Sequence, residues 1–199
     1  MKRAFSLVAI IFVLFVLATV FFTVIPLSLS NVKQAKFISD WKNYMEQVIY
    51  SYETLSEYKK NYNIDEKASI KRLLHYLDAK PAKLSDKNIK NYKYRMLNSR
   101  FYKKNNIDSS TKVYSDINGH LMWVEYTNKA FPIAMVWVDL NGYKNPNIVG
   151  KDIFVYEIYK DSVSPYGKNL NMKSIKADCS RLGTGMACSQ FFILGGNLK

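Results

Sequence analysis

A polar stretch in the C-terminal half of the chain carries the side chains best suited to binding a metal ion. Asp139, Asn141 and Asp152 lie within residues 139–152, which also contain two glycines and a proline. Their carboxylate and amide oxygens are hard ligands, the kind that calcium prefers in a turning loop. The spacing is not that of an EF-hand, and three side chains are fewer than the roughly six ligands that calcium takes. The stretch therefore predicts either a calcium site or a hydrogen-bonded loop that joins two strands.

The two cysteines of the chain are spaced for a structural bond. Cys179 and Cys188 enclose a short stretch that contains two glycines. Outside the reducing interior of a cell, such a pair predicts a disulfide. The spacing is not that of a Cys-x-x-Cys redox motif, and the sequence offers no further histidines and cysteines nearby to complete a zinc site. We therefore expect a disulfide that closes a short loop.

The sequence motifs of the common enzyme classes are absent. The sequence contains no glycine-rich phosphate loop, no nucleophile elbow and no His-Glu-x-x-His motif. With two histidines in the whole chain, general acid–base chemistry near neutral pH has few candidates. Carboxylates are more numerous, but no pair has a spacing that singles it out. We expect a protein that is not an enzyme.

Length, composition and charge narrow the class of protein further. The chain has 199 residues, which suits one domain with an appendage. Hydrophobic residues make up 48% and charged residues 23%, a balance that excludes disordered, collagen-like and low-complexity proteins. The formal net charge is +13, but the lysines are scattered and form no block. We interpret the charge as a solvated basic face, and we do not expect direct binding to nucleic acid.

The N-terminal region is a basic start followed by an apolar run. Lys2 and Arg3 precede residues 5–25, which as an α-helix would be about 31 Å long. That length matches the roughly 30 Å hydrocarbon core of a bilayer and predicts a transmembrane helix with a cytoplasmic N-terminus. A cleaved secretory signal is the alternative, because Ser28 and Ser30 are small residues spaced like a signal-peptidase site.

The first residues also resemble the processing segment of type IV prepilins and of the pseudopilins of type II secretion. Arg3-Ala4-Phe5 is similar to the site at which prepilin peptidase removes a short basic leader, here residues 1–4. The resemblance implies cleavage between Ala4 and Phe5, methylation of the new N-terminus, and an apolar helix that is both anchor and assembly core of a filament. Pro26 lies where many pilins have a proline that kinks this helix, since proline has no backbone N–H to donate.

Two positions depart from the pattern of that family. Ala4 replaces the usual glycine before the cleavage site. Ala9 stands where most members have a glutamate, whose carboxylate meets the amino terminus of a neighbouring subunit. Because some minor pseudopilins also lack this glutamate, the second departure points to a minor subunit. The order Asp-x-Asn-Gly, Pro-Asn and Gly-x-Asp in residues 139–152 is likewise similar to a segment that follows a central strand in pseudopilins.

The residues after the apolar run predict an amphipathic helix. Aromatic and aliphatic side chains recur at spacings of three and four from Phe37 to Leu55, and charged residues lie mostly between them. We expect this helix over 31–61, as a continuation of the transmembrane and assembly helix over 5–30. The alternative is a separate core helix behind a short linker.

The remaining sequence predicts a helical part and then a β-rich part. Residues 62–112 indicate a basic helical insertion, with helices that begin after Asp65 and after Ser85. Residues 113–199 indicate a β-rich globular part with the disulfide loop. Apolar, β-branched runs between turn residues predict strands at 121–124, 133–138 and 153–159, with a last strand at 190–194.

The predicted fold class is α+β and pilin-like. A long N-terminal helix, with a membrane half and an amphipathic half, would pack on a small antiparallel β-sheet that carries a helical insertion. Together with the resemblance, this predicts a structural minor pilin or pseudopilin of a type II secretion or type IV pilus machine. It would be a single-pass protein of the bacterial inner membrane, with its globular part periplasmic or otherwise extracytoplasmic.

The resemblance also implies partners. They are other pilin or pseudopilin subunits, prepilin peptidase, the inner-membrane assembly platform and membrane lipid. We expect no cofactor apart from the calcium considered above. Two alternatives stay open: a signal-anchored extracytoplasmic binding domain unrelated to pili, and a DNA-uptake pilin.

Overall fold

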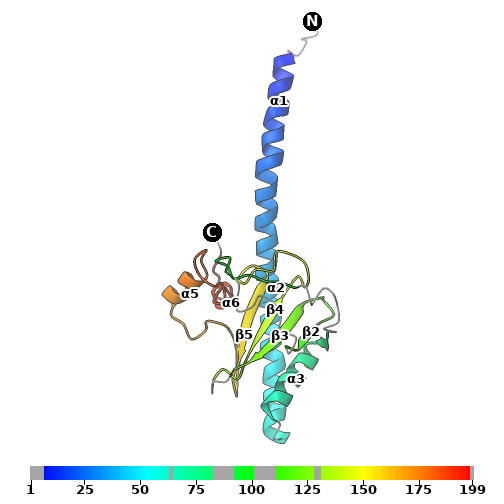
Figure 1. Ribbon diagram of the computed structural model, residues 1–199, viewed down its shortest axis with the longest axis vertical. Helices are drawn as coiled ribbons and strands as arrows, with labels where there is room; N and C mark the ends of the chain where they lie inside the picture. Colours follow the sequence, from blue (N-terminus) through cyan, green and yellow to red (C-terminus); the bar gives the residue numbers. More distant parts are fainter. Residues whose placement is uncertain (1–6, 63–64, 83–91, 101–110, 128–130, 198–199) are drawn as a thin grey trace. The chain divides into compact units, whose positions relative to one another are not determined.

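The chain forms two compact units, residues 1–36 and residues 37–199. The long helix α2 (Ile25–Tyr62) contributes to both of them. The structure is a computed structural model, and Figure 1 draws its helices and strands. It describes residues 7–62, 65–82, 92–100, 111–127 and 131–197.

The described part of the first unit is helical throughout. α1 (Leu7–Thr19) is followed by a π-helical segment, η1 (Val20–Val24), and then by the first turns of α2. The backbone N–H of Ile25 donates to the carbonyl of Val20, five residues earlier, as in a π-helix. Pro26 comes next and has no N–H for the carbonyl four residues before it. The wider turn thus lies directly before the proline at which the sequence predicted a kink.

The predicted transmembrane helix is wrong. Within the described residues, no helix combines the length and the apolar character needed to cross a membrane. α1 has 13 residues and is therefore about 20 Å long, short of the roughly 30 Å of a bilayer core. α2 is longer, but polar and charged side chains are frequent in it. The membrane half of the predicted fold and the predicted single-pass inner-membrane localisation are therefore not supported.

The second unit is built on a six-stranded sheet. Its strand order is β1-β2-β3-β4-β5-β6, and every neighbouring pair is antiparallel, as the sequence predicted. The three central strands pair over their whole length, whereas the outer strands are short. The strands are β1 (Lys80–Pro81), β2 (Val113–Ser115), β3 (Leu121–Tyr126), β4 (Ala134–Asp139), β5 (Ile153–Ile158) and β6 (Val163–Pro165).

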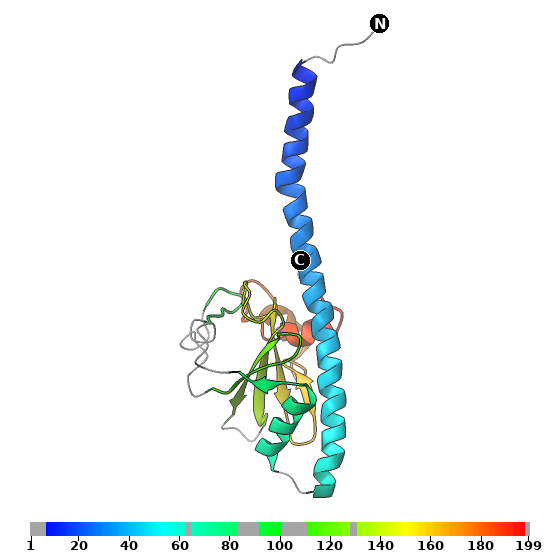
Figure 2. The same ribbon diagram turned by 90° about the vertical axis from the view of Figure 1, so that its right-hand side faces the viewer.

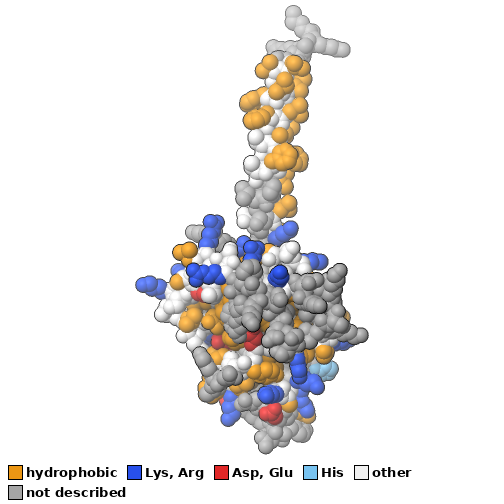
Figure 3. Space-filling model, in the orientation of Figure 1, with side chains coloured by type: hydrophobic (Ala, Val, Ile, Leu, Met, Phe, Trp, Pro, Cys, Tyr) orange, Lys and Arg blue, Asp and Glu red, His pale blue; other side chains and the backbone are white. Residues whose placement is uncertain are grey.

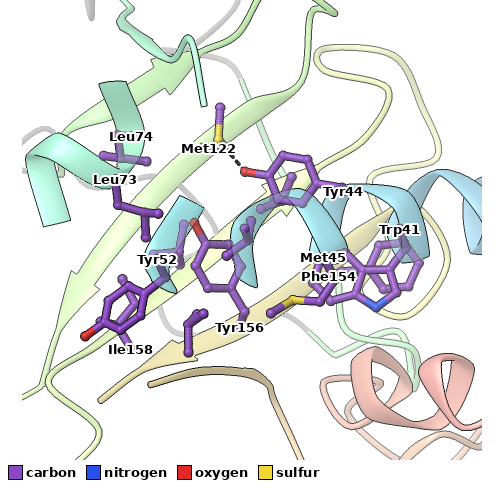
Figure 4. Packing of buried hydrophobic residues seen from close by; sticks show 14 of the residues in the cluster. Trp41, Tyr44, Met45, Tyr52, Leu73, Leu74, Met122, Phe154, Tyr156 and Ile158 are labelled. Carbon is purple, nitrogen blue, oxygen red and sulfur yellow. Dashed lines mark hydrogen bonds between the residues drawn. The ribbon is translucent and has the colours of Figure 1, made fainter. Parts of the chain in front are cut away.

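One face of this sheet is covered by the C-terminal part of α2 (Figure 2). The apolar stripe predicted from the spacing of the residues is the face that packs, since Trp41, Tyr44, Val48, Tyr52 and Leu55 are all buried. Figure 4 shows Trp41, Tyr44 and Tyr52 of the helix beside labelled residues of the strands. The strand residues are Met122, Val124, Val136, Val138, Phe154, Tyr156 and Ile158.

Three shorter helices complete the second unit. α3 (Glu66–Tyr76) follows the predicted start at Asp65 and adds Leu73 and Leu74 to the core beneath α2. α5 (Met172–Asp178) and α6 (Cys188–Ile193) lie near the C-terminus. The predicted strand at 190–194 is wrong, because most of this apolar run forms α6.

The opposite face of the sheet has its own aromatic core. Trp123 and Trp137 stack with their ring centroids 5.8 Å apart. Tyr92 and Tyr94 pack on them from a segment without helix, residues 92–100, where the sequence had predicted one. Arg95 of this segment forms a parallel bridge with Ile148, which places the segment beside the polar stretch between β4 and β5.

Candidate functional site

The polar stretch 139–152 connects β4 to β5, and the antiparallel register brings its two ends together. Asp139 is the last residue of β4 and pairs with Ile153, the first residue of β5. The N–H of Leu140 donates to the carbonyl of Asp152 at 2.9 Å, which closes the base of the loop. Both aspartates have no exposed surface. The fold therefore buries two carboxyl groups next to one another.

The carboxylate of Asp152 holds the loop by accepting hydrogen bonds. Its Oδ1 accepts from the N–H of Ile148 at 2.7 Å, and its Oδ2 accepts from the N–H of Asn147 at 2.8 Å. The side-chain amide of Asn141 donates to the same Oδ2 at 3.1 Å. Burial raises the pKa of Asp152, and these donors partly offset that effect.

The pKa of the Asp139 carboxyl group is strongly raised. Tyr92 donates its hydroxyl to Oδ2, and the N–H of Asn141 donates to Oδ1 at 3.0 Å. Burial, together with the nearby charge of Asp152, raises the pKa of Asp139 to about 8. The carboxyl group is thus largely protonated at neutral pH. Burial and the contact with Asp139 also raise the pKa of Tyr92 well above its usual value.

The structure brings together the three residues that the sequence proposed, and it adds two that the sequence did not reveal. Asn141 bonds to both Asp139 and Asp152. Tyr92 comes from a segment 47 residues earlier, and no local pattern predicts such a contact. Asn147 has a positive φ of 49°, and its place after a proline is the one available sequence signal, because asparagine tolerates this conformation in turns.

Two amide oxygens in the loop have no hydrogen-bond partner. They are Oδ1 of Asn141 and Oδ1 of Asn147, both buried and unpaired within the described part of the chain. Asn147 is anchored by its amide nitrogen, which donates to the carbonyl of Lys93 at 3.3 Å. A buried acceptor without a donor is unfavourable. A cation that accepted these oxygens as ligands would remove this penalty.

The oxygen atoms of the loop are of the kind that calcium takes as ligands. Among the described residues, no three or more His, Cys, Asp or Glu side chains form a group that could hold a metal ion. Calcium would therefore have to be held by the carboxylates of Asp139 and Asp152 and by the amide oxygens of Asn141 and Asn147. Its charge would favour the ionised form of Asp139, which burial disfavours.

The predicted disulfide is present and lies against this loop. Cys179 and Cys188 are bonded. Gly150 of the polar loop has a φ of +82°, and a Cβ there would lie 2.8 Å from Sγ of Cys188 and 2.9 Å from the carbonyl oxygen of Gly185. Only glycine fits such a close approach. The disulfide loop and the polar loop are therefore packed together.

The carboxylate of Asp178, the last residue of α5, accepts hydrogen bonds from residues of the disulfide loop. Oδ1 of Asp178 accepts from the N–H and the hydroxyl of Thr184, at 2.8 and 2.6 Å. Oδ2 of Asp178 accepts from the N–H of Ala187 at 2.8 Å. These bonds satisfy the backbone donors of Thr184, within the loop, and of Ala187, the residue directly before α6.

The other predicted site residues lie elsewhere. Ala4 and Phe5, the predicted cleavage and methylation site, fall outside the described residues. Pro26 lies near the start of α2, in the first unit. None of these three residues belongs to the polar loop, residues 139–152.

The first prediction concerns the disulfide. Replacing Cys179 and Cys188 by serine should lower the free energy of unfolding by about 2–3 kcal/mol, because the unfolded chain gains the freedom that the closed ring removes. Denaturant unfolding of the variant and of the parent protein measures the difference. The double variant should keep its far-ultraviolet circular dichroism, since the other apolar side chains between α2 and the sheet stay in place around the two replaced residues. Equal unfolding midpoints would contradict the prediction.

The second prediction concerns the raised pKa of Asp139. The folded protein keeps a proton on this group up to about pH 8, whereas the unfolded chain releases it near pH 4. The free energy of unfolding should therefore fall as the pH rises from about 5 to 8, by up to about 1.4 kcal/mol per pH unit. Asp139→Asn should make this decline shallower, leaving the part that comes from Asp152 and Glu157, whose pKa values are also raised.

Denaturant unfolding at several pH values tests this, with Asp161→Asn as the matched control. Asp161 is exposed, so its replacement removes the same charge without touching the loop. The control should keep the slope of the parent protein. The same slope in Asp139→Asn as in the parent protein would rule out the proposed titration.

If the loop binds calcium, adding calcium at pH 8 should raise the unfolding midpoint of the parent protein and not that of Asp139→Asn. Magnesium should raise the midpoint of the parent protein less than calcium does.

Comparisons with known proteins give this site no counterpart. No family model, no curated protein and no solved structure matches the chain. The function of the chain is therefore inferred from the residues and contacts described above.

Proposed function

We propose that the chain is a minor subunit of a pilin- or pseudopilin-type assembly, in a type II secretion or type IV pilus machine. In this proposal the N-terminal apolar helix joins the subunit to its neighbours. The residues Arg3-Ala4-Phe5, followed by the apolar run, support the proposal through their similarity to prepilin processing segments.

The exposed apolar surface of α1 is the observation that carries the proposal. None of the 13 residues of α1 is buried. Leu7 is 74% exposed, Phe12 67% and Phe15 66%. Figure 3 shows hydrophobic side chains along the N-terminal helix. An apolar helix with no buried face is marginal by itself in water and has to be covered by another surface.

The independence of the second unit supports the same role for α1. The second unit contains both hydrophobic clusters, the whole sheet and the disulfide. All the buried residues that form these clusters follow Phe37 in the sequence. Because this unit forms its core without α1, the apolar side chains of α1 are left for contacts with other molecules.

Ala9 supports the minor rather than the major subunit. In the pilin family, a glutamate at the corresponding place meets the amino terminus of the next subunit. Alanine has no carboxylate and cannot make that contact. A subunit with this residue suits a position where no such contact is needed, such as the tip of a filament or an initiating complex. We therefore expect this protein to be scarce beside a major subunit that has the glutamate.

The third prediction tests assembly through α1. In the native host, the full chain with a C-terminal tag should co-purify with other subunits of the same machine. Replacing both Phe12 and Phe15 by aspartate should reduce the co-purified subunits by about tenfold or more, since about 1.4 kcal/mol of lost contact already gives that factor. Mass spectrometry of the purified material measures the amounts.

Two exposed tyrosines of the second unit provide the matched control. Tyr50 is 74% exposed and Tyr76 51% exposed, so their replacement by aspartate changes two surface aromatic residues in the same way. This variant should keep its partners. Both variants should unfold at the same denaturant concentration as the parent protein, because neither pair of residues is in a core. Retention of partners by the Phe12 and Phe15 variant, or their equal loss in the control, would refute the proposal.

A further inference from the structure

A pocket of about 670 Å³ lies in the second unit, away from the polar loop. It is formed by α3 and by residues of β1, β2 and β3. Figure 1 shows α3 beside β2 and β3. A volume of this size is typical of sites for small organic molecules.

The floor of the pocket is apolar. Ile70 and Leu74 of α3 and Val113 of β2 line it, and each is no more than 2% exposed. They belong to the cores of the protein, so the floor is rigid and its shape is set by the fold. Tyr114 and Tyr126 add aromatic rings to the lining. Such walls favour the apolar body of a ligand over a fully hydrated ion.

The rim of the pocket is positively charged. Lys67, Lys71 and Lys112 line it and are exposed, and none of the described lining residues is an aspartate or a glutamate. Lys67 and Lys71 are four residues apart on α3 and so lie on the same side of the helix. Nζ of Lys67 is 5.7 Å from the centre of the Tyr126 ring, which holds this ammonium group at the edge of the pocket.

We propose that this pocket binds a small amphiphilic organic anion. The ligand has an apolar body, which lies on Ile70, Leu74 and Val113, and one carboxylate or phosphate group, which meets the lysine ammonium groups at the rim. The combination of an apolar floor and a rim of one charge sign selects this class. A neutral apolar molecule leaves the lysines without a partner, and a small inorganic anion leaves the floor uncovered.

Titration of the full chain with decanoate, followed by nuclear magnetic resonance, tests the proposal. Decanoate should shift the backbone amide signals of Ala68, Leu74 and Ala82, which line the pocket or lie next to its lining residues. Decanol has the same chain without the charge, and acetate has the charge without the chain. Decanol and acetate should each bind at these residues at least about tenfold more weakly than decanoate. Decanol lacks the contact with the lysines, and acetate lacks the contact with the apolar floor.

Replacing Lys67, Lys71 and Lys112 together by glutamine should weaken decanoate binding by about tenfold. Three ammonium groups near one carboxylate at a solvent-exposed rim contribute about a factor of ten to the affinity. The matched control replaces three exposed lysines elsewhere in the second unit, Lys168, Lys173 and Lys176, by glutamine. This control changes the net charge by the same amount and should leave the affinity unchanged.

Four results would overturn the proposal. They are equal binding of decanol and decanoate at the pocket, an equal loss of affinity in the two lysine variants, signal shifts confined to α1, and no shift at all at Ala68, Leu74 and Ala82. Binding that follows the predicted order would establish the site even if the chain proved not to be a filament subunit, because the pocket lies wholly in the second unit.

Discussion

The second unit depends above all on the contacts of one tryptophan. The indole of Trp41, on α2, stacks on Phe154 of β5 with the ring centroids 4.9 Å apart, and its Nε1 donates to the carbonyl of Ser189 at 2.8 Å. Ser189 lies in α6, and its hydroxyl accepts from the N–H of Val155 at 2.9 Å. One buried side chain therefore fixes a helix, a central strand and the C-terminal helix together, and these contacts leave its polar atom paired.

The polar loop depends on the same set of contacts. Ser189 follows Cys188, whose sulfur lies against Gly150 of the loop. β5, held beneath Trp41, begins directly after Asp152. The loop can thus keep two buried carboxyl groups in place because both of its sides are fixed by the core. This explains how a loop with unfavourable burial of Asp139 persists: the surrounding packing supplies the stability that the loop itself lacks.

The sequence predicted most of the elements that a simple periodicity determines. The spacing from Phe37 to Leu55 identified the buried face of α2, and the runs of β-branched and aromatic residues identified the three central strands. Asp139, Asn141 and Asp152, which the sequence offered as candidate calcium ligands, lie together because the two aspartates flank a loop between paired strands. The disulfide was found because a short cysteine spacing leaves few alternatives.

The errors also have physical causes. A count of apolar residues over 5–25 predicted one membrane-spanning helix, whereas the α-helical hydrogen bonding is interrupted by the π-helical segment before Pro26. The run Phe191 to Leu194 is apolar and short, and a run of this kind fits a buried strand and a helix equally well. Tyr92 could not be assigned to Asp139, since a contact between residues 47 positions apart depends on the tertiary fold alone. The helix predicted after Ser85 is wrong over the described residues 92–97 for the same reason, because Tyr92 and Tyr94 pack on Trp123 and Trp137 from a segment without helix.

We propose that the chain acts through α1, and the mature protein must therefore retain this helix. Mass spectrometry of the N-terminus of the protein from its native host tests this most directly. We expect a chain that begins at Phe5 with a methylated amino group, so that Lys2 and Arg3 are removed and the whole of α1 is kept. A mature chain that begins at Asn31 would contradict it, because cleavage there would remove α1 and with it the surface proposed to join the subunits.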